Sequence, residues 1–339
     1  MHFSGRTRKV SFEVIDVALV FASRAFLARG AASFLVLMSG GVIGGCKNSA
    51  QKPSPNSSPA GSAKSLSVPA GQDPVLVGAG DIAFCGDLAG AEATAKLLDS
   101  IPGVVFTAGD NAYENGTAEE FKNCYQPTWG RHKDRTRPGV GNHEFHSNSA
   151  TPYFEYFGAR AGDSSKGYYS YELGTWHIVV LNSECVEVGG CQSGSREEKW
   201  LISDLEAHPS RCILAYWHKP LFSSGAKHGN DPDMKAFWID LYKYYATVVI
   251  NGHDHDYERF AAQDPDGKPD PTRGIREFVA GTGGRNHRPF ADPLPTTEVR
   301  NADTFGVLKM TLHPGAYEWE FIPEAGKTFH DSGASSCNQ

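Results

Sequence analysis

The sequence of 339 residues has no long run of lysine or arginine, and its formal net charge at pH 7 is −7. Proteins that bind nucleic acid through its phosphates normally carry a basic patch, so we expect no nucleic-acid partner. The seven cysteines include no Cys-x-x-Cys pair, the spacing of zinc ribbons and redox pairs. No internal repeat is visible in the sequence. A negatively charged protein that acts on an anionic substrate needs local positive charge, which a bound metal ion can supply.

The apolar stretch near the N-terminus, residues 31–45, is too short to cross a bilayer, which takes about 20 residues. It follows several arginines and ends at Ile43-Gly44-Gly45-Cys46, which resembles a bacterial lipobox with a lipidated cysteine. We therefore expect residues 1–46 to be an export signal, with a lipid anchor at Cys46 and a periplasmic or cell-surface location. A cleaved signal without lipid is the alternative. The segment around Arg24 resembles a twin-arginine export motif in which Ser23 replaces the first arginine, so the export route is left open.

Residues 47–70 are rich in Ser, Pro, Ala and Gly and contain almost no large apolar side chain, which predicts a flexible tether. We predict a single domain over residues 71–339. If Cys46 carries lipid, six cysteines remain, and an even number in an exported protein favours disulfides. Cys185 and Cys191 close a short loop and are the most direct pair. Two further pairs follow only by elimination: Cys85 with Cys124, and Cys212 with Cys337.

Apolar runs alternate with segments of helical periodicity along the first half of this domain. We predict strands at 74–81, 104–107, 137–141, 168–173, 176–182 and 212–217, with helices at 88–100 and 195–207. A helix at 233–245 and strands at 248–250, 274–280, 304–311 and 317–322 follow. This order predicts an α/β (α+β mixed) fold: a four-layer α/β/β/α sandwich of two mixed sheets flanked by helices.

Five clusters of metal-ligand residues each follow an apolar run, and most have a glycine beside the candidate ligand. Loops at strand ends are where α/β scaffolds place their chemistry. The carboxylate, amide, phenol and imidazole donors suit two hard or borderline cations and not a thiolate site. Two cations about 3.5–4 Å apart can share a carboxylate and clamp a phosphoryl group. The clusters are Gly80-Asp81-Ile82-Ala83, Gly109-Asp110-Asn111-Ala112-Tyr113, Gly141-Asn142-His143-Glu144, Ala215-Tyr216-Trp217-His218 and Gly252-His253-Asp254-His255.

From Val75 to Phe321, the order and the residues of these clusters resemble those of the metallophosphoesterase (calcineurin-like) superfamily and, within it, the purple acid phosphatases. Ala83 stands where other superfamily members have a ligand histidine, and Tyr113 stands where purple acid phosphatases have a tyrosinate ligand. The family's tyrosinate site holds iron(III), and its other site holds zinc, manganese or iron(II). A phenol, with an ordinary pKa of about 10, is readily deprotonated only by a strongly acidic cation. The resemblance implies one metal on Asp81, Asp110, Tyr113 and His255, and a second on Asp110, Asn142, His218 and His253, with Asp110 bridging.

The resemblance also implies a phosphatase that hydrolyses small phosphate monoesters by in-line attack of a metal-bound hydroxide. His143 follows the ligand Asn142 and is a candidate to bond a phosphoryl oxygen, with Glu144 as the residue that orients it. His228 matches a histidine that purple acid phosphatases carry beside the metal ligands without binding the metal itself. Because a loop imidazole titrates near the working pH, it is a candidate general acid or phosphate ligand. Tyr257-Glu258-Arg259 is interpreted as a structural salt-bridge corner.

Other functions remain open on the same residues. A phosphodiesterase or nucleotide pyrophosphatase would use the same metal centre, because monoesters and diesters differ by one substituent at phosphorus. A catalytically silent, lipid-anchored surface metalloprotein would keep its metal for stability, and an iron pair could serve a redox role. Comparing hydrolysis of a monoester and a diester separates the first alternative from the leading prediction.

Overall fold

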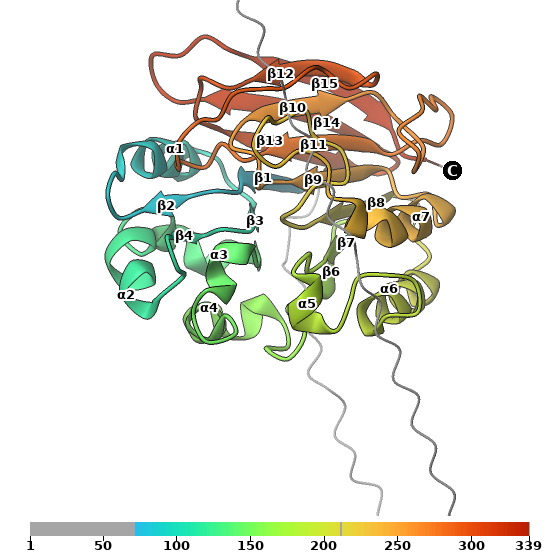
Figure 1. Ribbon diagram of the computed structural model, residues 1–339. Helices are drawn as coiled ribbons and strands as arrows, with labels where there is room; N and C mark the ends of the chain where they lie inside the picture. Colours follow the sequence, from blue (N-terminus) through green and yellow to red (C-terminus); the bar gives the residue numbers. More distant parts are fainter. Residues whose placement is uncertain (1–71, 211, 339) are drawn as a thin grey trace, which may run out of the picture. The chain divides into compact units, whose positions relative to one another are not determined.

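The structure, a computed structural model, describes residues 72–210 and 212–338 (Figure 1). The predicted export signal, residues 1–46, and the predicted tether, residues 47–70, lie outside the described residues. The strands are β1 Val75–Ala79, β2 Ala83–Phe84, β3 Val104–Ala108, β4 Ala112–Tyr113, β5 Thr136–Gly139, β6 Tyr169–Leu173, β7 Trp176–Val180, β8 Cys212–Tyr216, β9 Val248–Asn251, β10 Tyr257–Phe260, β11 Arg276–Ala280, β12 Thr297–Asn301, β13 Gly306–His313, β14 Ala316–Pro323 and β15 Asp331–Ser336. The helices are α1 Ala89–Ser100, α2 Ala118–Glu120, α3 Asn142–Phe145, α4 Thr151–Phe157, α5 Cys185–Val188, α6 Arg196–Ala207 and α7 Lys235–Lys243, with short 3₁₀ or π segments at η1 Phe121–Tyr125, η2 Trp129–Arg135, η3 Gly158–Ala161 and η4 Pro232–Met234.

Two mixed sheets form the centre of the domain. The first has six strands in the order β15-β14-β13-β1-β3-β5, with β1, β3 and β5 parallel. The second has seven strands in the order β12-β10-β11-β9-β8-β7-β6, with β7, β8, β9 and β11 parallel. Alternate side chains of a strand point to opposite faces, and one set from each sheet enters a shared buried cluster that includes Leu76, Phe106, Leu214 and Ile250. The main core therefore lies between the sheets.

Helices cover the outer face of each sheet (Figure 1). α1 buries Ala91 and Leu98, which share one helical stripe, in a cluster with Val77 of β1. On the second sheet, α6 and α7 bury Leu201 and Leu241 in another cluster. Each sheet thus has one face toward its partner sheet and one toward helices, and the predicted four-layer sandwich is confirmed.

The strand ends bring five loops to one region of the fold. Asp81 follows β1, Asp110 follows β3, Asn142 follows β5, His218 follows β8 and His253 follows β9, each two or three residues after the strand ends. The carboxyl ends of neighbouring parallel strands lie at the same edge of a sheet. The prediction that each cluster closes a strand is confirmed by these boundaries.

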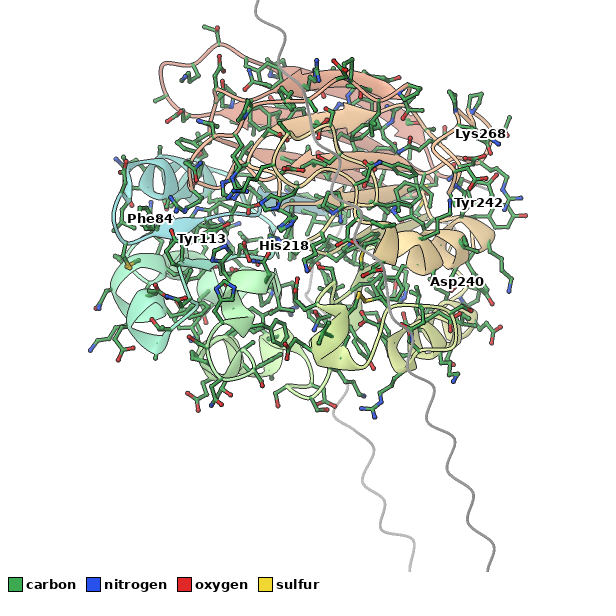
Figure 2. All side chains as sticks on the ribbon, viewed as in Figure 1. Phe84, Tyr113, His218, Asp240, Tyr242 and Lys268 are labelled. Carbon is green, nitrogen blue, oxygen red and sulfur yellow. A yellow bond between two sulfur atoms is a disulfide. The ribbon has the colours of Figure 1, made fainter. Side chains whose placement is uncertain are left out.

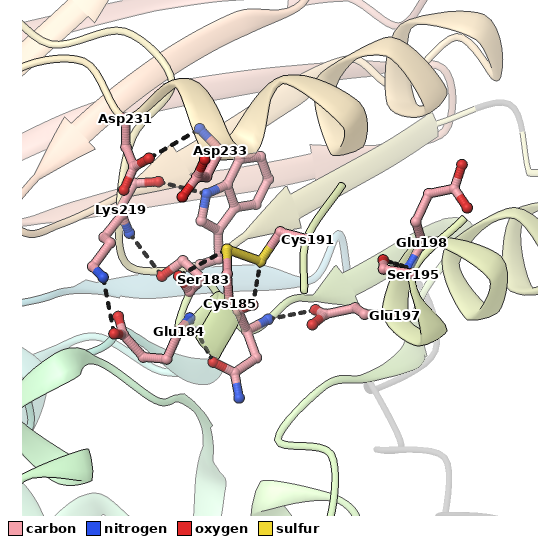
Figure 3. The surroundings of a disulfide bond; sticks show 12 residues. Ser183, Glu184, Cys185, Cys191, Ser195, Glu197, Glu198, Lys219, Asp231 and Asp233 are labelled. Atoms are coloured by element: carbon pink, nitrogen blue, oxygen red, sulfur yellow. Dashed lines mark hydrogen bonds and ion pairs between the residues drawn. A yellow bond between two sulfur atoms is a disulfide. The ribbon is translucent and has the colours of Figure 1, made fainter. Parts of the chain in front are cut away.

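Three disulfides join distant or neighbouring segments: Cys85–Cys124, Cys185–Cys191 and Cys212–Cys337. All three predicted pairs are confirmed. Figure 3 shows the loop closed by the second pair, beside the ion pair between Lys219 Nζ and Glu184 Oε2 at 2.9 Å. Disulfides in this number are typical of proteins that fold in an oxidising compartment.

The sequence pattern did not predict β10, β12 or β15. The interpretation of Tyr257-Glu258-Arg259 as a corner is wrong, because these residues form β10 and pair with β11 and β12. Its salt bridge is present, since Arg259 contacts Glu298 and its Nε lies 2.8 Å from Asp331 Oδ2. Within the described part of the chain, no helix is long and apolar enough to cross a membrane.

Candidate metal centre

The seven predicted ligands lie together where the five loops meet. Five are almost fully buried, with 0–2% of their surface exposed: Asp81, Asp110, Tyr113, His218 and His255. Asn142 and His253 are half-buried. Figure 2 labels Tyr113, in β4 of the two-stranded sheet, and His218, in the loop that follows β8 of the seven-stranded sheet. Their role as metal ligands stays a prediction. The distances between their oxygen and nitrogen atoms are described next.

Three predicted ligands surround the hydroxyl oxygen of Tyr113. It lies 2.6 Å from Asp81 Oδ1, 2.9 Å from Asp110 Oδ2 and 3.4 Å from His255 Nε2. His255 Nε2 is also 3.3 Å from Asp81 Oδ1. These four residues, here called the Tyr113 group, are the set that the resemblance assigns to the first metal.

A second set of donors surrounds Nε2 of His218. That atom lies 3.1 Å from Asp110 Oδ2, 3.2 Å from Asn142 Oδ1 and 3.1 Å from His253 Nδ1. These four residues are called the His218 group. Asp110 Oδ2 belongs to both groups, which is the position that a bridging carboxylate requires.

The backbone at three predicted ligands adopts a left-handed conformation. The φ angles are 62° at Asp81, 50° at Asp110 and 72° at His253. Non-glycine residues hold this conformation at an energetic cost, and such positions concentrate at functional sites. Close packing adds a second constraint, because a Cβ on Gly141 would lie 2.2 Å from Asp110 Oδ1. The glycine in this cluster therefore makes room for the shared carboxylate.

Main-chain oxygens orient two of the imidazoles. His218 Nδ1 lies 2.8 Å from the carbonyl oxygen of Ala108, and His255 Nδ1 lies 2.9 Å from that of Asn286. A carbonyl oxygen only accepts hydrogen bonds, so each Nδ1 donates and each neutral ring presents a lone pair at Nε2. Metal-ligating histidines commonly have this outer partner, which fixes the tautomer.

The electrostatics of the metal-free chain follow from burial and from mutual charge. Burial lowers the pKa of His218, but the Asp110 carboxylate outweighs it and raises that pKa to about 10. Burial, and then the charges of Asp110 and Asp81, raise the pKa of Tyr113 well above its ordinary value. Tyr113 therefore keeps its proton unless a cation displaces it.

A count of protons tests whether the residues fit metal ions. The Tyr113 hydroxyl has one proton but faces the carboxylates of Asp81 and Asp110, so it can donate to only one of them. His218 is protonated in the metal-free chain at neutral pH, and its one Nε2 proton faces Asp110 Oδ2, Asn142 Oδ1 and His253 Nδ1, so it too can donate fully to only one of them. A cation in each group would turn these acceptor contacts into attractions, so the residues present fit two metal ions.

The two predicted catalytic histidines lie beside different groups. His143 packs on the Tyr113 ring with centroids 4.3 Å apart, and its Nε2 is 3.8 Å from Asp110 Oδ2. His228 is exposed, packs on His253 with centroids 3.9 Å apart and contacts Arg288. Packing on His253 removes part of the ring from water, and this desolvation, and then the Arg288 charge, lower the pKa of His228 to about 4.

Glu144 does not orient His143, so that prediction is wrong. His143 Nδ1 lies 2.6 Å from the main-chain oxygen of Glu114 instead. Burial, and then the Asp110 charge, raise the pKa of Glu144 to about 8, although its backbone donors favour the ionised form. Glu144 is the third residue of α3, and it accepts from the backbone N–H of the N-cap residue Gly141, which is one half of a capping box; Gly141 has no side chain to supply the other half. The Glu144 carboxylate accepts hydrogen bonds of 2.7–3.2 Å from the backbone N–H groups of Asp110, Asn111, Ala112 and Gly141.

Sequence reasoning also missed two residues beside the cluster. The backbone N–H of Arg285 donates to the carbonyl oxygen of Asp81 at 2.9 Å, and the Arg285 side chain forms an ion pair with Glu114. Arg285 directly follows the glycine-rich turn 281–284, and Glu114 directly follows Tyr113. Adjacency to these features is the signal that could have identified them.

A separate cluster of imidazoles and carboxylates contains His177, Asp204 and His208, whose ligand-type atoms lie within 4.8 Å of one another. His177 is 1% exposed, and its two nitrogens lie 2.6 Å from Glu172 Oε1 and 2.8 Å from Asp204 Oδ2. One protonated imidazole therefore satisfies two carboxylates. The His177 and His208 rings stack with 13° between their planes, so they do not direct lone pairs to one ion. We interpret this His177 cluster as complete in its hydrogen bonds without a metal.

The fold and the site together define a class: an α/β sandwich of two mixed sheets with oxygen and nitrogen donors for metal ions at its strand ends. The family model of calcineurin-like phosphoesterases matches residues 80–257, just over half of the 339 residues. The chain belongs to the calcineurin-like phosphoesterase family. All seven predicted ligands lie within the matched residues.

Similar proteins in this family are purple acid phosphatases. Purple acid phosphatase 15 of Arabidopsis thaliana is 29% identical over 220 residues, which cover 53% of this chain and 41% of that protein. Purple acid phosphatase 18 of the same plant is 26% identical over 266 residues, with coverages of 71% and 57%. The structure of purple acid phosphatase PPD1 from yellow lupin (Lupinus luteus) seeds has a TM-score of 0.63 at 17% identity and covers 78% of this chain and 54% of that one. The chain spans about half the length of these proteins, and its resemblance to purple acid phosphatases is confirmed.

Proposed function

We propose that this chain is an exported phosphatase that hydrolyses small phosphate monoesters with two bound metal ions. Iron(III) would occupy the Tyr113 group, and zinc, manganese or iron(II) would occupy the His218 group. The observation that carries the proposal is the position of Asp110 Oδ2, which lies 2.9 Å from Tyr113 Oη and 3.1 Å from His218 Nε2. One carboxylate oxygen thus contacts both donor groups, as a pair of neighbouring cations requires.

Two cations bound by the Tyr113 group and the His218 group would neutralise phosphoryl charge and activate water for an in-line displacement. The chain's own residues would hold the substrate. His143 Nδ1 is engaged by the Glu114 carbonyl oxygen, so its Nε2 is left to bind a phosphoryl oxygen. In this tautomer Nε2 presents a lone pair and binds a protonated phosphoryl oxygen, whereas the imidazolium donates to an ionised one.

His228 would serve as a phosphate ligand in preference to a general acid. With a pKa of about 4 in the metal-free chain, its imidazole is neutral near pH 7 and has no extra proton to deliver to a leaving group. A neutral ring still donates one hydrogen bond. Its contact with Arg288 places a guanidinium beside it, and both groups attract an anion.

The first experiment measures the visible absorption spectrum, the metal content and the hydrolysis of p-nitrophenyl phosphate for the wild-type chain and for Tyr113→Phe. We expect about two metals per chain and a tyrosinate-to-iron(III) charge-transfer band that Tyr113→Phe abolishes, with a fall in kcat of about 10²-fold or more. Tyr125→Phe is the matched control, because Tyr125 is equally buried and its hydroxyl has no hydrogen-bond partner among the described residues. A colourless protein that still binds two metals and hydrolyses esters would show that Tyr113 is not an iron(III) ligand.

The substrate class is tested by comparing p-nitrophenyl phosphate with bis-p-nitrophenyl phosphate. A higher kcat/KM for the monoester supports the proposal, and a higher value for the diester assigns the centre to a phosphodiesterase. Full metal content with no hydrolysis of either ester would identify a silent metalloprotein.

Export and lipid anchoring are part of the same proposal. The three disulfides support export, because such bonds persist in oxidising compartments. Metabolic labelling with radioactive palmitate tests the anchor. The wild-type chain should become labelled and Cys46→Ser should not, and an unlabelled wild-type chain would indicate a signal without lipid.

A further inference from the structure

The guanidinium group of Arg285 lies against the ring of Tyr113. Its Cζ is 5.2 Å from the Tyr113 ring centroid and 3.8 Å from the centroid of the Phe84 ring. β2 and β4 pair in a register that places Phe84 opposite Tyr113, and the Arg285 guanidinium lies over both rings. Arg285 is therefore held by a surface that the backbone pairing of these two short strands creates.

Three further contacts fix this cation. The Arg285 backbone N–H donates to the carbonyl oxygen of Asp81 at 2.9 Å, which ties it to a residue of the Tyr113 group. Its guanidinium pairs with Glu114, the residue after Tyr113. Arg285 Nε is buried without a hydrogen-bond partner among the described residues, as expected for a guanidinium edge that faces aromatic rings.

The charge of Arg285 is only partly neutralised by its ion pair. The side chain of Arg285 is 20% exposed, whereas that of Glu114 is 45% exposed and is better screened by water. A cation over an aromatic face is attracted by the electron density of the ring. If Tyr113 is a tyrosinate, as the proposed function holds, its ring carries more negative charge and the attraction increases.

We propose that Arg285 is a positioning residue that sets how strongly the Tyr113 oxygen donates electrons to a cation bound in the Tyr113 group. This inference rests on the proposed function, because it needs a tyrosinate ligand. The guanidinium lies against the donor ring, so it stabilises electrons on the ring more than electrons on the bound ion. Arg285 thus weakens donation from Tyr113 and favours iron(II) relative to iron(III).

The experiment compares the wild-type chain, loaded with iron and zinc, with Arg285→Met and Glu114→Gln. The readouts are the wavelength of the tyrosinate charge-transfer band and the reduction potential of the iron. We expect Arg285→Met to move the band to longer wavelength, to lower the potential and to raise the ratio of iron(III) to iron(II) affinity by about tenfold, the order expected for a desolvated cation–π pair. Glu114→Gln removes the neutralising carboxylate and should move the band to shorter wavelength.

Arg273→Met is the matched control. Arg273 also lies over a tyrosine, with Cζ 4.2 Å from the ring of Tyr242, which is not a predicted ligand (Figure 2 labels Tyr242). It should leave the band and the potential unchanged.

The inference is overturned if Arg285→Met leaves the band in place, or if Arg285→Met and Glu114→Gln move it in the same direction. Metal content is measured on each variant, so a loss of iron is distinguished from a shift of the band. A wild-type band that Tyr113→Phe abolishes and Arg285→Met does not shift leaves the proposed function intact and removes only this inference. A wild-type protein that binds iron without any such band removes both.

Discussion

Two clusters of imidazoles and carboxylates lie within the described part of the chain, and they differ in how their protons and acceptors match. In the His177 cluster, each ring nitrogen of His177 faces its own carboxylate, at 2.6 Å and 2.8 Å, so one imidazolium completes the set. Around Asp110 the acceptors outnumber the protons, because the single Tyr113 hydroxyl faces two carboxylates. The comparison shows that residue types alone do not define a metal site. What distinguishes the Asp110 cluster is that more oxygen and nitrogen atoms converge on shared points than there are protons to bridge them.

The two clusters also differ in their backbone. Three predicted ligands of the metal centre have positive φ angles, Asp81, Asp110 and His253, whereas His177 and Asp204 lie within the regular elements β7 and α6. Positive φ at non-glycine residues costs energy, which the surrounding structure has to offset. Such strain is expected where the binding of a ligand offsets it. It is absent at His177 and Asp204, whose hydrogen bonds are satisfied within the protein.

The largest effect that separates the clusters is expected from Asp110→Asn. Because Asp110 Oδ2 contacts both donor groups, the change should weaken the binding of both metal ions. It should also lower kcat/KM for p-nitrophenyl phosphate by about three orders of magnitude. Metal analysis and steady-state kinetics measure the two losses together. Asp134→Asn is the control, since its side chain is 98% exposed and its ion pair in the described residues is with Arg160. Retention of both metals with near-wild-type activity would contradict a bridging role.

A change at His177 should act on stability and not on metal content. Burial lowers the pKa of His177, but hydrogen bonds to Asp204 and Glu172 and the charges of these residues outweigh it and raise the pKa above its usual value. The stabilisation is therefore fully present below the unfolded pKa of about 6.5 and is lost as the pH rises through the folded pKa. We expect His177→Gln to lower the free energy of unfolding by about 3 kcal/mol at pH 6, and by less at pH 9.

Urea unfolding at pH 6 and pH 9 measures this difference. His208→Gln is the matched control, because His208 is 46% exposed and stacks on His177 without replacing either carboxylate contact; we expect a change of about 0.5 kcal/mol. An equal loss for His177→Gln at both pH values would show that folding does not raise the pKa of His177.

Much of the site could be predicted because each ligand loop follows a buried strand of apolar residues, such as Val104–Ala108 before Asp110. The strands that were missed lack this signal. β15, Asp331–Ser336, is an edge strand of polar and small residues, which have low strand propensity. It is a strand because its backbone pairs with β14. Glu144 was misassigned for a related reason, because its partners are backbone N–H groups, which side-chain patterns do not reveal. Local patterns indicate burial and chemistry, whereas edge pairing and backbone hydrogen bonds depend on tertiary context.

The smallest and most selective effect is expected from removal of metal. A ligand present at a hundredfold excess over its Kd stabilises the folded state by about 2.7 kcal/mol, so dialysis against a chelator should lower Tm by about 5–10 °C. Asp110→Asn should lose most of this difference between the metal-loaded and metal-free protein. Asp204→Asn should keep all of it, even if its Tm is lower throughout, because Asp204 belongs to the His177 cluster. A chelator-dependent difference that disappears in Asp204→Asn would mean that the second cluster also binds metal, and the contrast in proton count between the two clusters would then be wrong.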